Sequence, residues 1–298
     1  MKGNCHIHAL LDGRDWRQAI DRHREKPDEN YLHGLLSTYA DLGYTYLRDG
    51  GDRWGAGARA RSLAKSYGIT YRTPLAPLCR KGCYGGFIGT TYENLSQYRD
   101  LVVKNREMGA DFIKIMISGL MDFDRFGVLM QKGPELGEIP ELVRIAQEEG
   151  MAVMAHGNGA EAVTAAARAG VDSIEHGAYL NEEALHAMKE SGTVWVPTLS
   201  TIGNLRGKGR FQEAAVEKIL QSAMENVRYF LKIGGKIAPG DDAGAWAVPH
   251  GCETEETLLY QAGAREADLQ AGFMAIMEKF WFYVNSWGRA KIEKLELV

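Results

Sequence analysis

Four histidines, one lysine and an acidic pair occur along this 298-residue chain at the ends of, or within, runs that predict buried strands. The first two, His6 and His8 in "NCHIHALLDG", are one residue apart, so an extended strand turns both imidazoles to one face. Imidazoles and carboxylates are side chains that bind divalent cations such as zinc. The spacing therefore predicts a metal site that begins near the N-terminus.

The other members of this set belong to four further strand-like runs. Lys114 lies within "DFIKIMISG", His156 ends "MAVMAHGNG", and His176 follows "DSIE". Asp241 and Asp242 follow "KIAPG". A lone histidine at a strand end is more often a hydrogen-bonded core residue than a ligand. Four such histidines together with an acid favour a metal centre.

Eight short β-like runs alternate with helical patterns that end in glycine, the residue that commonly terminates a helix. The alternation predicts βαβ units with a parallel sheet, and eight of them in order predict an α/β fold of the (β/α)8 TIM barrel type. In such barrels catalytic groups lie at the C-terminal ends of the strands. An open doubly wound sheet is the alternative, but no glycine-rich fingerprint follows the first strand. The predicted strands are residues 3–8, 45–48, 70–75, 112–116, 152–155, 173–175, 194–197 and 236–238.

This pattern predicts two parts of the chain: a barrel over residues 1–284 and a C-terminal tail over residues 285–298. The segment "READLQAGFMAIMEKFWFYVNS" predicts a helix added after the barrel. The following "WGRAKIEKLELV" alternates apolar and polar residues, which is typical of an edge strand.

Composition narrows the class of protein. Hydrophobic residues make up 45% and charged residues 25%, and the net charge is −4, so a basic surface for nucleic acid is not expected. No apolar run reaches about 18 residues, so no membrane span is expected. The N-terminus lacks the apolar core of a secretory signal, which makes a cytoplasmic location the expectation. The cysteines are expected to be free thiols, because "CRKGC" does not have a usual zinc spacing: Cys5, Cys79, Cys83 and Cys252.

Lys114 has three interpretations on the residues alone. An interior lysine is costly when charged and unpaired, so it could pair with Asp241 or Asp242. It could also be a Schiff-base nucleophile, as in aldolases that work without metal. The third interpretation is carbamylation by carbon dioxide, which makes a carboxylate able to bridge two cations. Spacing does not choose among these.

The chain resembles the amidohydrolase superfamily, most of all its branch of metal-dependent prolidases, carboxypeptidase-like enzymes and imidazolonepropionase-like proteins. The resemblance rests on "NCHIH", "GADFIKIMISG", "VMAHGNG", "SIEHG", "GDDAG" and "VPHG", in this order, and covers nearly the whole chain. It implies two divalent metal ions, expected to be zinc. By this resemblance His6 and His8 bind the more buried ion, His156 and His176 bind the second, and carbamylated Lys114 bridges the two.

The same resemblance assigns Asp242 as a metal ligand and as the catalytic base and acid. In that scheme a metal-bridging hydroxide attacks the scissile carbonyl, and Asp242 takes its proton and passes it to the leaving amine. The family usually has Asp where Asn4 stands, and a small hydroxyl residue where Asp241 stands. In the family that Asp supports the ligand shell, and here Asn4 takes its place; we expect Asp241 to be a rim residue.

Relatives usually carry a small β-sandwich built from both termini, and this sequence starts at the first barrel strand. The resemblance thus implies a barrel without that flanking domain, with the tail as a remnant of it. Without this domain the first strand would lack its usual cover. Association into a homo-oligomer through the uncovered face of that strand is therefore one expectation.

The predicted function is hydrolysis of an amide C–N bond in a small-molecule substrate of the dipeptide or N-acyl amino acid type. Candidate substrate-binding residues are His250 in "VPHG", Tyr84 in the glycine-rich loop after the third strand, and Arg206 in the basic loop after the seventh. Arginine suits a substrate carboxylate. Arg48 and Asp49, at the end of the second predicted strand, are further candidates.

Three alternatives remain open at this point. A lactone or cyclic amide hydrolase would use the same fold and the same attacking hydroxide. A class I aldolase would use Lys114 as a Schiff-base nucleophile. A metal-binding barrel that has lost catalysis would keep the ligands without turnover.

Overall fold

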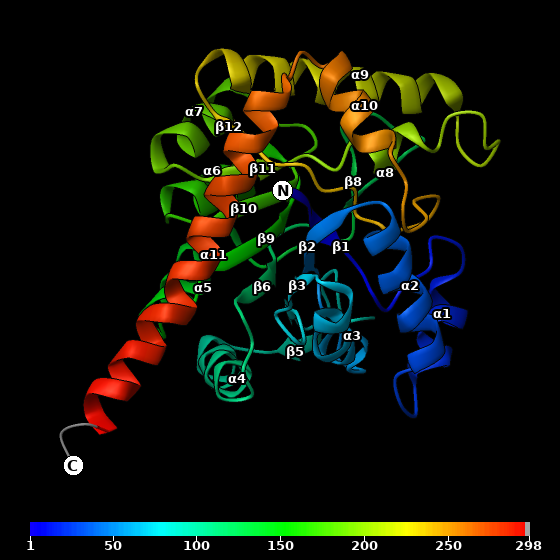
Figure 1. Cartoon of the computed structure of the whole chain (residues 1–298). Coiled ribbons are helices and arrows are strands. Elements are labelled where there is room, and N and C mark those ends of the chain that lie inside the picture. The colour runs from blue at the N-terminus through cyan, green and yellow to red at the C-terminus, as the bar shows by residue number, and fades with distance from the viewer. Residues whose placement is uncertain (296–298) are drawn as a thin grey trace.

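The computed structural model describes residues 1–295 of the chain, with side chains described up to residue 280. The predicted barrel is confirmed, and each of the eight predicted strands is present within a few residues of its expected bounds. The strands pair in parallel in the orders β1-β2-β3 and β12-β11-β10-β9-β6-β4-β5, with helices around them (Figure 1). Their bounds are β1 (Lys2–Ile7), β2 (Tyr44–Asp49), β3 (Thr70–Arg72), β4 (Leu78–Arg80), β5 (Thr90–Tyr92), β6 (Ile113–Met116), β9 (Val153–Gly157), β10 (Ser173–His176), β11 (Val194–Val196) and β12 (Lys236–Ile237).

Backbone hydrogen bonds join the two sheets into a closed barrel. On one side the Cys5 N–H in β1 donates to the Pro239 carbonyl just after β12, at 2.9 Å. On the other side the Asp111 N–H before β6 donates to the Thr73 carbonyl after β3, at 3.0 Å. Closure brings the C-terminal ends of the first and eighth barrel strands side by side.

The third barrel strand is interrupted, which the sequence pattern did not show. β3 pairs with β2, whereas β4 pairs with β6, and Pro74 and Pro77 lie in the segment between them. Proline has no N–H to donate to a ladder, so continuous pairing through this segment is disfavoured. β4 and β5 then pair in parallel within the loop that carries Tyr84.

The helices on the outside of the barrel follow the predicted patterns. Asn94 and Asn181 cap α4 and α7, because each side chain accepts a hydrogen bond from a backbone N–H three residues on. The predicted helices are α2 (Glu29–Asp41), α3 (Ala56–Ala64), α4 (Leu95–Glu107), α5 (Ile139–Glu148), α6 (Ala160–Arg168), α7 (Glu182–Ser191), α9 (Glu213–Lys232) and α10 (Thr254–Gln261). Elements that we did not predict are α1 (Trp16–His23), α8 (Ser200–Gly203), the 3₁₀ helices η1 (Lys65–Tyr67) and η2 (Leu136–Glu138), and the antiparallel pair β7 (Leu120–Met121) and β8 (Leu129–Met130).

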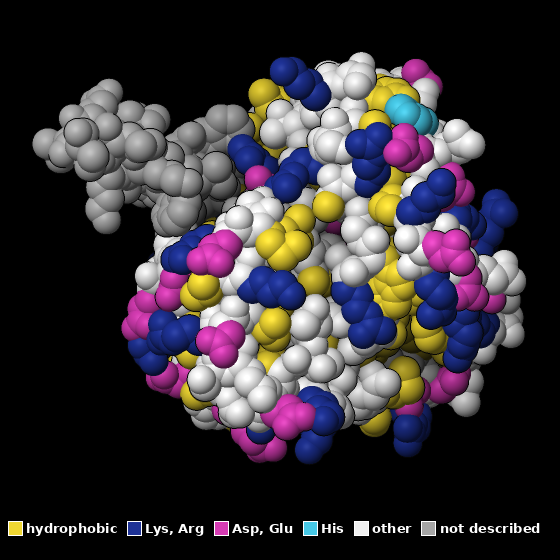
Figure 2. Space-filling model, turned by 90° about the horizontal axis from the view of Figure 1, so that it is seen from below, with side chains coloured by type: hydrophobic (Ala, Val, Ile, Leu, Met, Phe, Trp, Pro, Cys, Tyr) yellow, Lys and Arg dark blue, Asp and Glu magenta, His cyan; other side chains and the backbone are white. Residues whose placement is uncertain are grey.

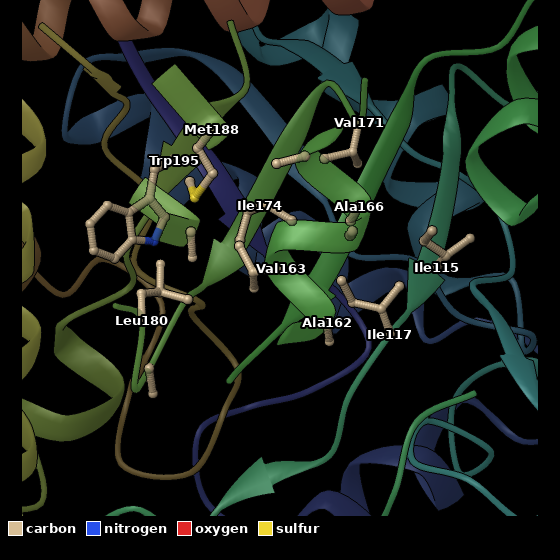
Figure 3. Packing of buried hydrophobic residues seen from close by; sticks show 14 of the residues in the cluster. Ile115, Ile117, Ala162, Val163, Ala166, Val171, Ile174, Leu180, Met188 and Trp195 are labelled. Carbon is tan, nitrogen blue, oxygen red and sulfur yellow. The ribbon is translucent and has the colours of Figure 1, made fainter. Parts of the chain in front are cut away.

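The main core lies between the strands and this ring of helices. Ile174 of β10 and Trp195 of β11 are fully buried against Val163 of α6 and Met188 of α7 (Figure 3). Because alternate residues of a strand face opposite sides, outward apolar residues leave the inward positions of these strands for polar groups.

A last helix, α11 (Glu266–Leu295), packs against β1, β11 and β12 (Figure 1). Its Phe273 fits against Gly3, where a Cβ would lie 2.1 Å from the ring, and contacts Tyr46 at a ring distance of 5.5 Å. Phe280 contacts Phe112 just before β6, at 5.2 Å. The helix therefore covers the amino-terminal ends of the barrel strands.

The edge strand expected in the tail is wrong for residues 287–295, because α11 continues to Leu295. Alanine, lysine, glutamate and leucine dominate "AKIEKL", and these are strong helix formers that override a short alternating pattern. Residues 296–298 lie outside the described residues. Within residues 1–295 the strands belong to the barrel sheets or to the β7–β8 pair, and none forms a β-sandwich.

Figure 2 shows acidic and basic side chains interspersed over one face of the molecule. No helix in the described part of the chain is both long enough and apolar enough to cross a membrane.

Candidate metal centre

Three ligand atoms meet at the C-terminal ends of the first and eighth barrel strands. His6 Nε2 lies 3.4 Å from His8 Nε2 and 3.4 Å from Asp242 Oδ1, and His8 Nε2 lies 3.2 Å from Asp242 Oδ1. A tetrahedral zinc ion with bonds of about 2.0–2.1 Å sets its ligands about 3.3 Å apart. The triangle of His6, His8 and Asp242 therefore has the dimensions of one face of a cation site.

The orientation of His6 is fixed by a buried acid that the sequence analysis missed. His6 Nδ1 lies 2.8 Å from Glu175 Oε2, which leaves Nε2 to face the triangle. Arg48 donates to Glu175 Oε1 at 2.9 Å and to the Cys5 carbonyl at 2.7 Å, and both charged side chains are fully buried. A carboxylate on the second nitrogen of a ligand imidazole fixes its tautomer and raises its basicity.

Local backbone conformation lets β10 direct two consecutive residues into the barrel. Glu175 faces inward, so regular alternation would turn His176 outward. His176 instead has φ +70°, in the left-handed region that is uncommon for residues other than glycine. Asp242 likewise has φ +58°. Strained residues of this kind gather at functional sites, and here they aim a histidine and an acid at the same space.

His156 and His176, at the ends of the fifth and sixth barrel strands, lie beside the triangle. The rings of His6 and His176 have centroids 5.1 Å apart, and those of His176 and His156 are 4.6 Å apart. His156 Nε2 lies 3.2 Å from the Gly119 carbonyl, which can only accept, so Nδ1 keeps its lone pair. His176 Nδ1 lies 3.9 Å from Asp242 Oδ2. The structure thus brings the four predicted histidines and Asp242 into one cluster.

Lys114 is buried in the barrel interior, and its Nζ has no hydrogen-bond partner. No ion pair joins it to Asp241 or Asp242, so the paired interpretation of this lysine is wrong. Two more buried polar atoms of the cluster have no hydrogen-bond partner: Asp242 Oδ1 and His8 Nδ1. Buried polar atoms are normally satisfied, and a bound ion is one explanation of such exceptions.

Burial sets the protonation of the cluster. It lowers the pKa of His156 to about 3 and also lowers those of His6 and His176, so these imidazoles are neutral and able to act as ligands. Burial lowers the pKa of Lys114 to about 8. Burial alone would raise the pKa of Asp242, but His6 and His8 outweigh it and keep the group below its ordinary value. Neutral imidazoles, an ionised acid and unpartnered donors fit divalent cations.

Comparison with known proteins agrees with this fold. Ochratoxinase of Aspergillus niger is 31% identical over an alignment of 274 residues that covers 80% of this chain. The chain has the fold of the solved amidohydrolases and prolidases, and its sequence is similar to ochratoxinase. No protein-family model matches the chain. It spans 56% of the length of ochratoxinase, so somewhat more than half of that relative is represented here.

Solved structures of amidohydrolases and prolidases share the fold. A Xaa-Pro dipeptidase with bound methionine superposes with a TM-score of 0.76 at 22% identity, covering 94% of this chain and 75% of that one. An amidohydrolase gives 0.74 at 22% identity, with 93% and 73% covered. A. niger ochratoxinase gives 0.72 at 21% identity, with 91% and 68% covered.

The two departures from the amidohydrolase pattern, at Asn4 and Asp241, contact each other. The Asn4 amide donates to Asp241 Oδ1 at 2.7 Å, and its oxygen accepts from the backbone N–H of Asp241 at 3.3 Å and of His6 at 3.2 Å. Asp241 is 2% exposed, so the expected rim position is wrong. Burial raises its pKa to about 7. The pair ties the first barrel strand to the eighth beside the ligands.

Of the three predicted substrate-binding residues, Tyr84 lies beside the amidohydrolase cluster, with its ring 4.7 Å from that of His156. His250 uses both ring nitrogens in contacts within the protein: Nε2 with the Leu11 carbonyl at 2.9 Å and Nδ1 with the Tyr39 hydroxyl at 3.1 Å. It also lines a groove of about 420 Å³ between the loop after β12 and helices α1 and α2. These contacts brace the loop that follows Asp242.

Arg206 contacts its own loop and helix α9. Its Nε donates to the Gly203 carbonyl at 3.2 Å, and one terminal nitrogen lies 3.9 Å from Glu217. Its role in substrate binding stays a prediction.

The four cysteines are free thiols, as expected. Of the further candidates, Arg48 supports Glu175, whereas Asp49 accepts from the Thr73 hydroxyl at 3.0 Å.

Proposed function

We propose that this chain is a binuclear metal-dependent hydrolase that cleaves amide C–N bonds. The observation that carries the proposal is the triangle of His6, His8 and Asp242, with spacings of 3.2–3.4 Å, together with the unpartnered, buried Lys114 of β6. His156 and His176 would complete a second site. Divalent cations bound there, zinc by expectation, would polarise the scissile carbonyl and lower the pKa of a water molecule.

Asp242 would move the proton. It is ionised well below neutral pH, so its carboxylate can accept the proton of the attacking water and then donate it to the leaving nitrogen. Its left-handed backbone and the bond from its N–H to the His6 carbonyl, at 2.8 Å, hold the carboxylate in place between the histidines. Tyr84, whose ring lies against His156, would contact the substrate over the second site.

Lys114 would join the ligands as a carbamate. Its pKa of about 8 leaves part of the population as a neutral amine at neutral pH. That amine attacks the carbon of carbon dioxide: the N–C bond forms, one C=O electron pair moves to oxygen, and one proton leaves the nitrogen. The product is an anion whose two oxygens can reach two cations. A Schiff base is the competing use of the same amine.

The substrate class we propose is the dipeptide or N-acyl amino acid. It is supported by similarity to a Xaa-Pro dipeptidase, to a prolidase complexed with N-methylphosphonate-L-proline, and to ochratoxinase. Arg206 and His250 are proposed to contribute to binding from the loops after β11 and β12.

Metal analysis of the purified protein, combined with hydrolysis of dipeptides, Xaa-Pro dipeptides, N-acyl amino acids and ochratoxin, tests the proposal. We expect two metal equivalents and turnover that a chelator abolishes. Two equivalents without turnover would favour the catalytically silent barrel. Covalent trapping of a carbonyl compound by borohydride, unaffected by chelation, would favour the aldolase.

Lys114→Ala tests the bridging ligand. We expect bound metal to fall toward zero, because one ligand of both cations is lost. Lys189→Ala on the outside of α7 is the matched control and should keep its metal. Unchanged metal content in Lys114→Ala removes this lysine from the ligand set.

A further inference from the structure

The peptide that joins Asp241 to Asp242 is held in an unfavourable conformation. Asp242 has φ +58°, which costs an ordinary residue on the order of 1–3 kcal/mol unless its surroundings impose it. Its N–H is fixed by the His6 carbonyl at 2.8 Å. The other side of the same peptide, the Asp241 carbonyl, accepts from the hydroxyl of Ser200 at 2.7 Å.

Ser200 is the first residue of α8, and a buried acid from α10 contacts it. Glu255 Oε2 lies 2.7 Å from the Ser200 N–H nitrogen and 2.9 Å from the Ser200 hydroxyl oxygen. Both side chains are buried. Three segments far apart in sequence, after β11, after β12 and in α10, are therefore joined behind Asp242.

Counting hydrogens assigns the protonation of this group. The Ser200 hydroxyl carries one hydrogen but faces two oxygens, the Asp241 carbonyl and Glu255 Oε2. The carbonyl can only accept, so it takes the serine hydrogen. The short contact to Glu255 is then a hydrogen bond only when Oε2 carries a proton and donates it to the serine oxygen. A neutral Glu255 satisfies both contacts of the serine oxygen, whereas an ionised Glu255 competes with the Asp241 carbonyl for the one serine hydrogen.

The surroundings of Glu255 agree with a neutral acid. It is 3% exposed, and no cation forms an ion pair with it among the described residues. Burial raises its pKa to about 8; the hydrogen bonds from Ser200 and from the Leu199 backbone act in the opposite direction but are outweighed, and Asp241 adds a smaller increase. The groups that line the small cavity beside it are acidic or neutral, apart from one lysine already within 3.8 Å of an exposed glutamate: Lys2, Tyr44, Asp241, Cys252, Glu253 and Glu256.

We propose that Ser200 and neutral Glu255 are positioning residues for Asp242: the acid directs the serine hydroxyl to the Asp241 carbonyl and so holds the strained peptide whose side chain faces His6 and His8. The inference rests on the proposed role of Asp242 in metal binding and proton transfer. As an ionised carboxylate, Glu255 would compete for the serine hydrogen and release the peptide.

The test uses Ser200→Ala, which removes the hydroxyl, and Ser200→Thr, which keeps it. Glu255→Gln is the second informative variant, because it is neutral at every pH and keeps the volume of the acid. Thr193→Val is the matched control: it removes another buried hydroxyl, which donates to the Val171 carbonyl at 2.8 Å outside the cluster.

Each full-length protein is loaded with cobalt, and its visible absorption spectrum, metal content, kcat and KM are measured. We expect Ser200→Ala to bind cobalt with an altered spectrum and to lose roughly tenfold in kcat, the loss of about one hydrogen bond, with KM little changed. Ser200→Thr, Glu255→Gln and Thr193→Val should resemble the wild type.

Two results would overturn the inference: a wild-type cobalt spectrum in Ser200→Ala, or equal losses in Ser200→Ala and Thr193→Val. The spectrum needs no turnover, so it is informative even when no amide is hydrolysed. If Ser200→Ala fails to fold, a strongly altered spectrum in Glu255→Gln contradicts the proposed role of the neutral acid.

Discussion

His6 Nδ1 lies 2.8 Å from Glu175 Oε2, and this contact turns the other nitrogen of the imidazole toward His8 and Asp242. Glu175 is in turn held by Arg48 at 2.9 Å. A chain of three buried side chains therefore runs across the barrel interior to the first ligand.

Glu175→Gln should weaken metal binding. The amide keeps the volume but loses the charge that supports the tautomer of His6, and such partners are typically worth a 10–100-fold change in metal affinity. Competition with a chromophoric chelator measures the affinity. Glu183→Gln on the surface of α7, which removes an exposed pair with Arg168, is the control and should bind as the wild type. Equal affinities in the two variants would contradict the orienting role.

Gly50→Ala should displace His8. A Cβ at this position would lie 2.2 Å from His8 Cε1 and 2.7 Å from its Nε2, so the ring must move away from the triangle. We expect metal content to fall while the protein remains folded by circular dichroism. Gly34→Ala in α2 has no atom within 4 Å of the new Cβ and should stabilise the helix by about 0.5–1 kcal/mol with full metal content.

The pH dependence of stability should report on Glu255. Its pKa rises from 4.5 to about 8 on folding, so between these values the folded protein holds a proton that the unfolded chain has released. Stability from this group is complete below about pH 4.5 and is lost with a slope of about 1.4 kcal/mol per unit as the pH rises to about 8.

Glu255→Gln removes this dependence, so its free energy of unfolding relative to the wild type should increase across that window. Urea unfolding of both holoproteins at several pH values measures the difference. A difference that stays constant from about pH 5 to about pH 8 would show that Glu255 is already ionised in the folded protein.

Phe273→Ala should destabilise the barrel from its amino-terminal end. The ring is 2% exposed and fills the space beside Gly3, and removing a buried phenylalanine typically costs about 3–5 kcal/mol. Thermal unfolding measures the change. Met274→Ala, one residue on and 51% exposed, should stay within about 0.5 kcal/mol of the wild type. Similar melting temperatures for the two variants would mean that α11 contributes little.

The sequence was most informative where local periodicity and burial agree. Strands such as β9 and helices such as α6 have patterns set by one neighbouring layer, and both were predicted within two or three residues. The interruption between β3 and β4 depends on pairing with two different strands, which no local pattern contains. The end of α11 was predicted as a strand because the six residues of "AKIEKL" fit the two-residue period of a strand as well as the period of a helix.

Within the cluster, residue type predicted the histidines and the acid that lie together, but not the side chains that hold them in place. The spacing of His6 and His8 shows from the sequence that both side chains lie on one face of a strand. Glu175 is adjacent to His176, and regular alternation would place these two side chains on opposite faces of the strand. The left-handed turn at His176 removes that conflict, and it is visible only in the backbone. Ser200 and Glu255 meet through the closure of the barrel, 55 residues apart.

Arg48 also contacts the last helix, since its guanidinium lies 4.5 Å from the centre of the Phe280 ring. The series of contacts that holds His6, through Glu175 and Arg48, therefore ends at Phe280 of α11. During synthesis on the ribosome, the barrel strands emerge well before that aromatic ring does. The nascent chain would acquire its complete metal-binding geometry only after α11 has left the exit tunnel and docked.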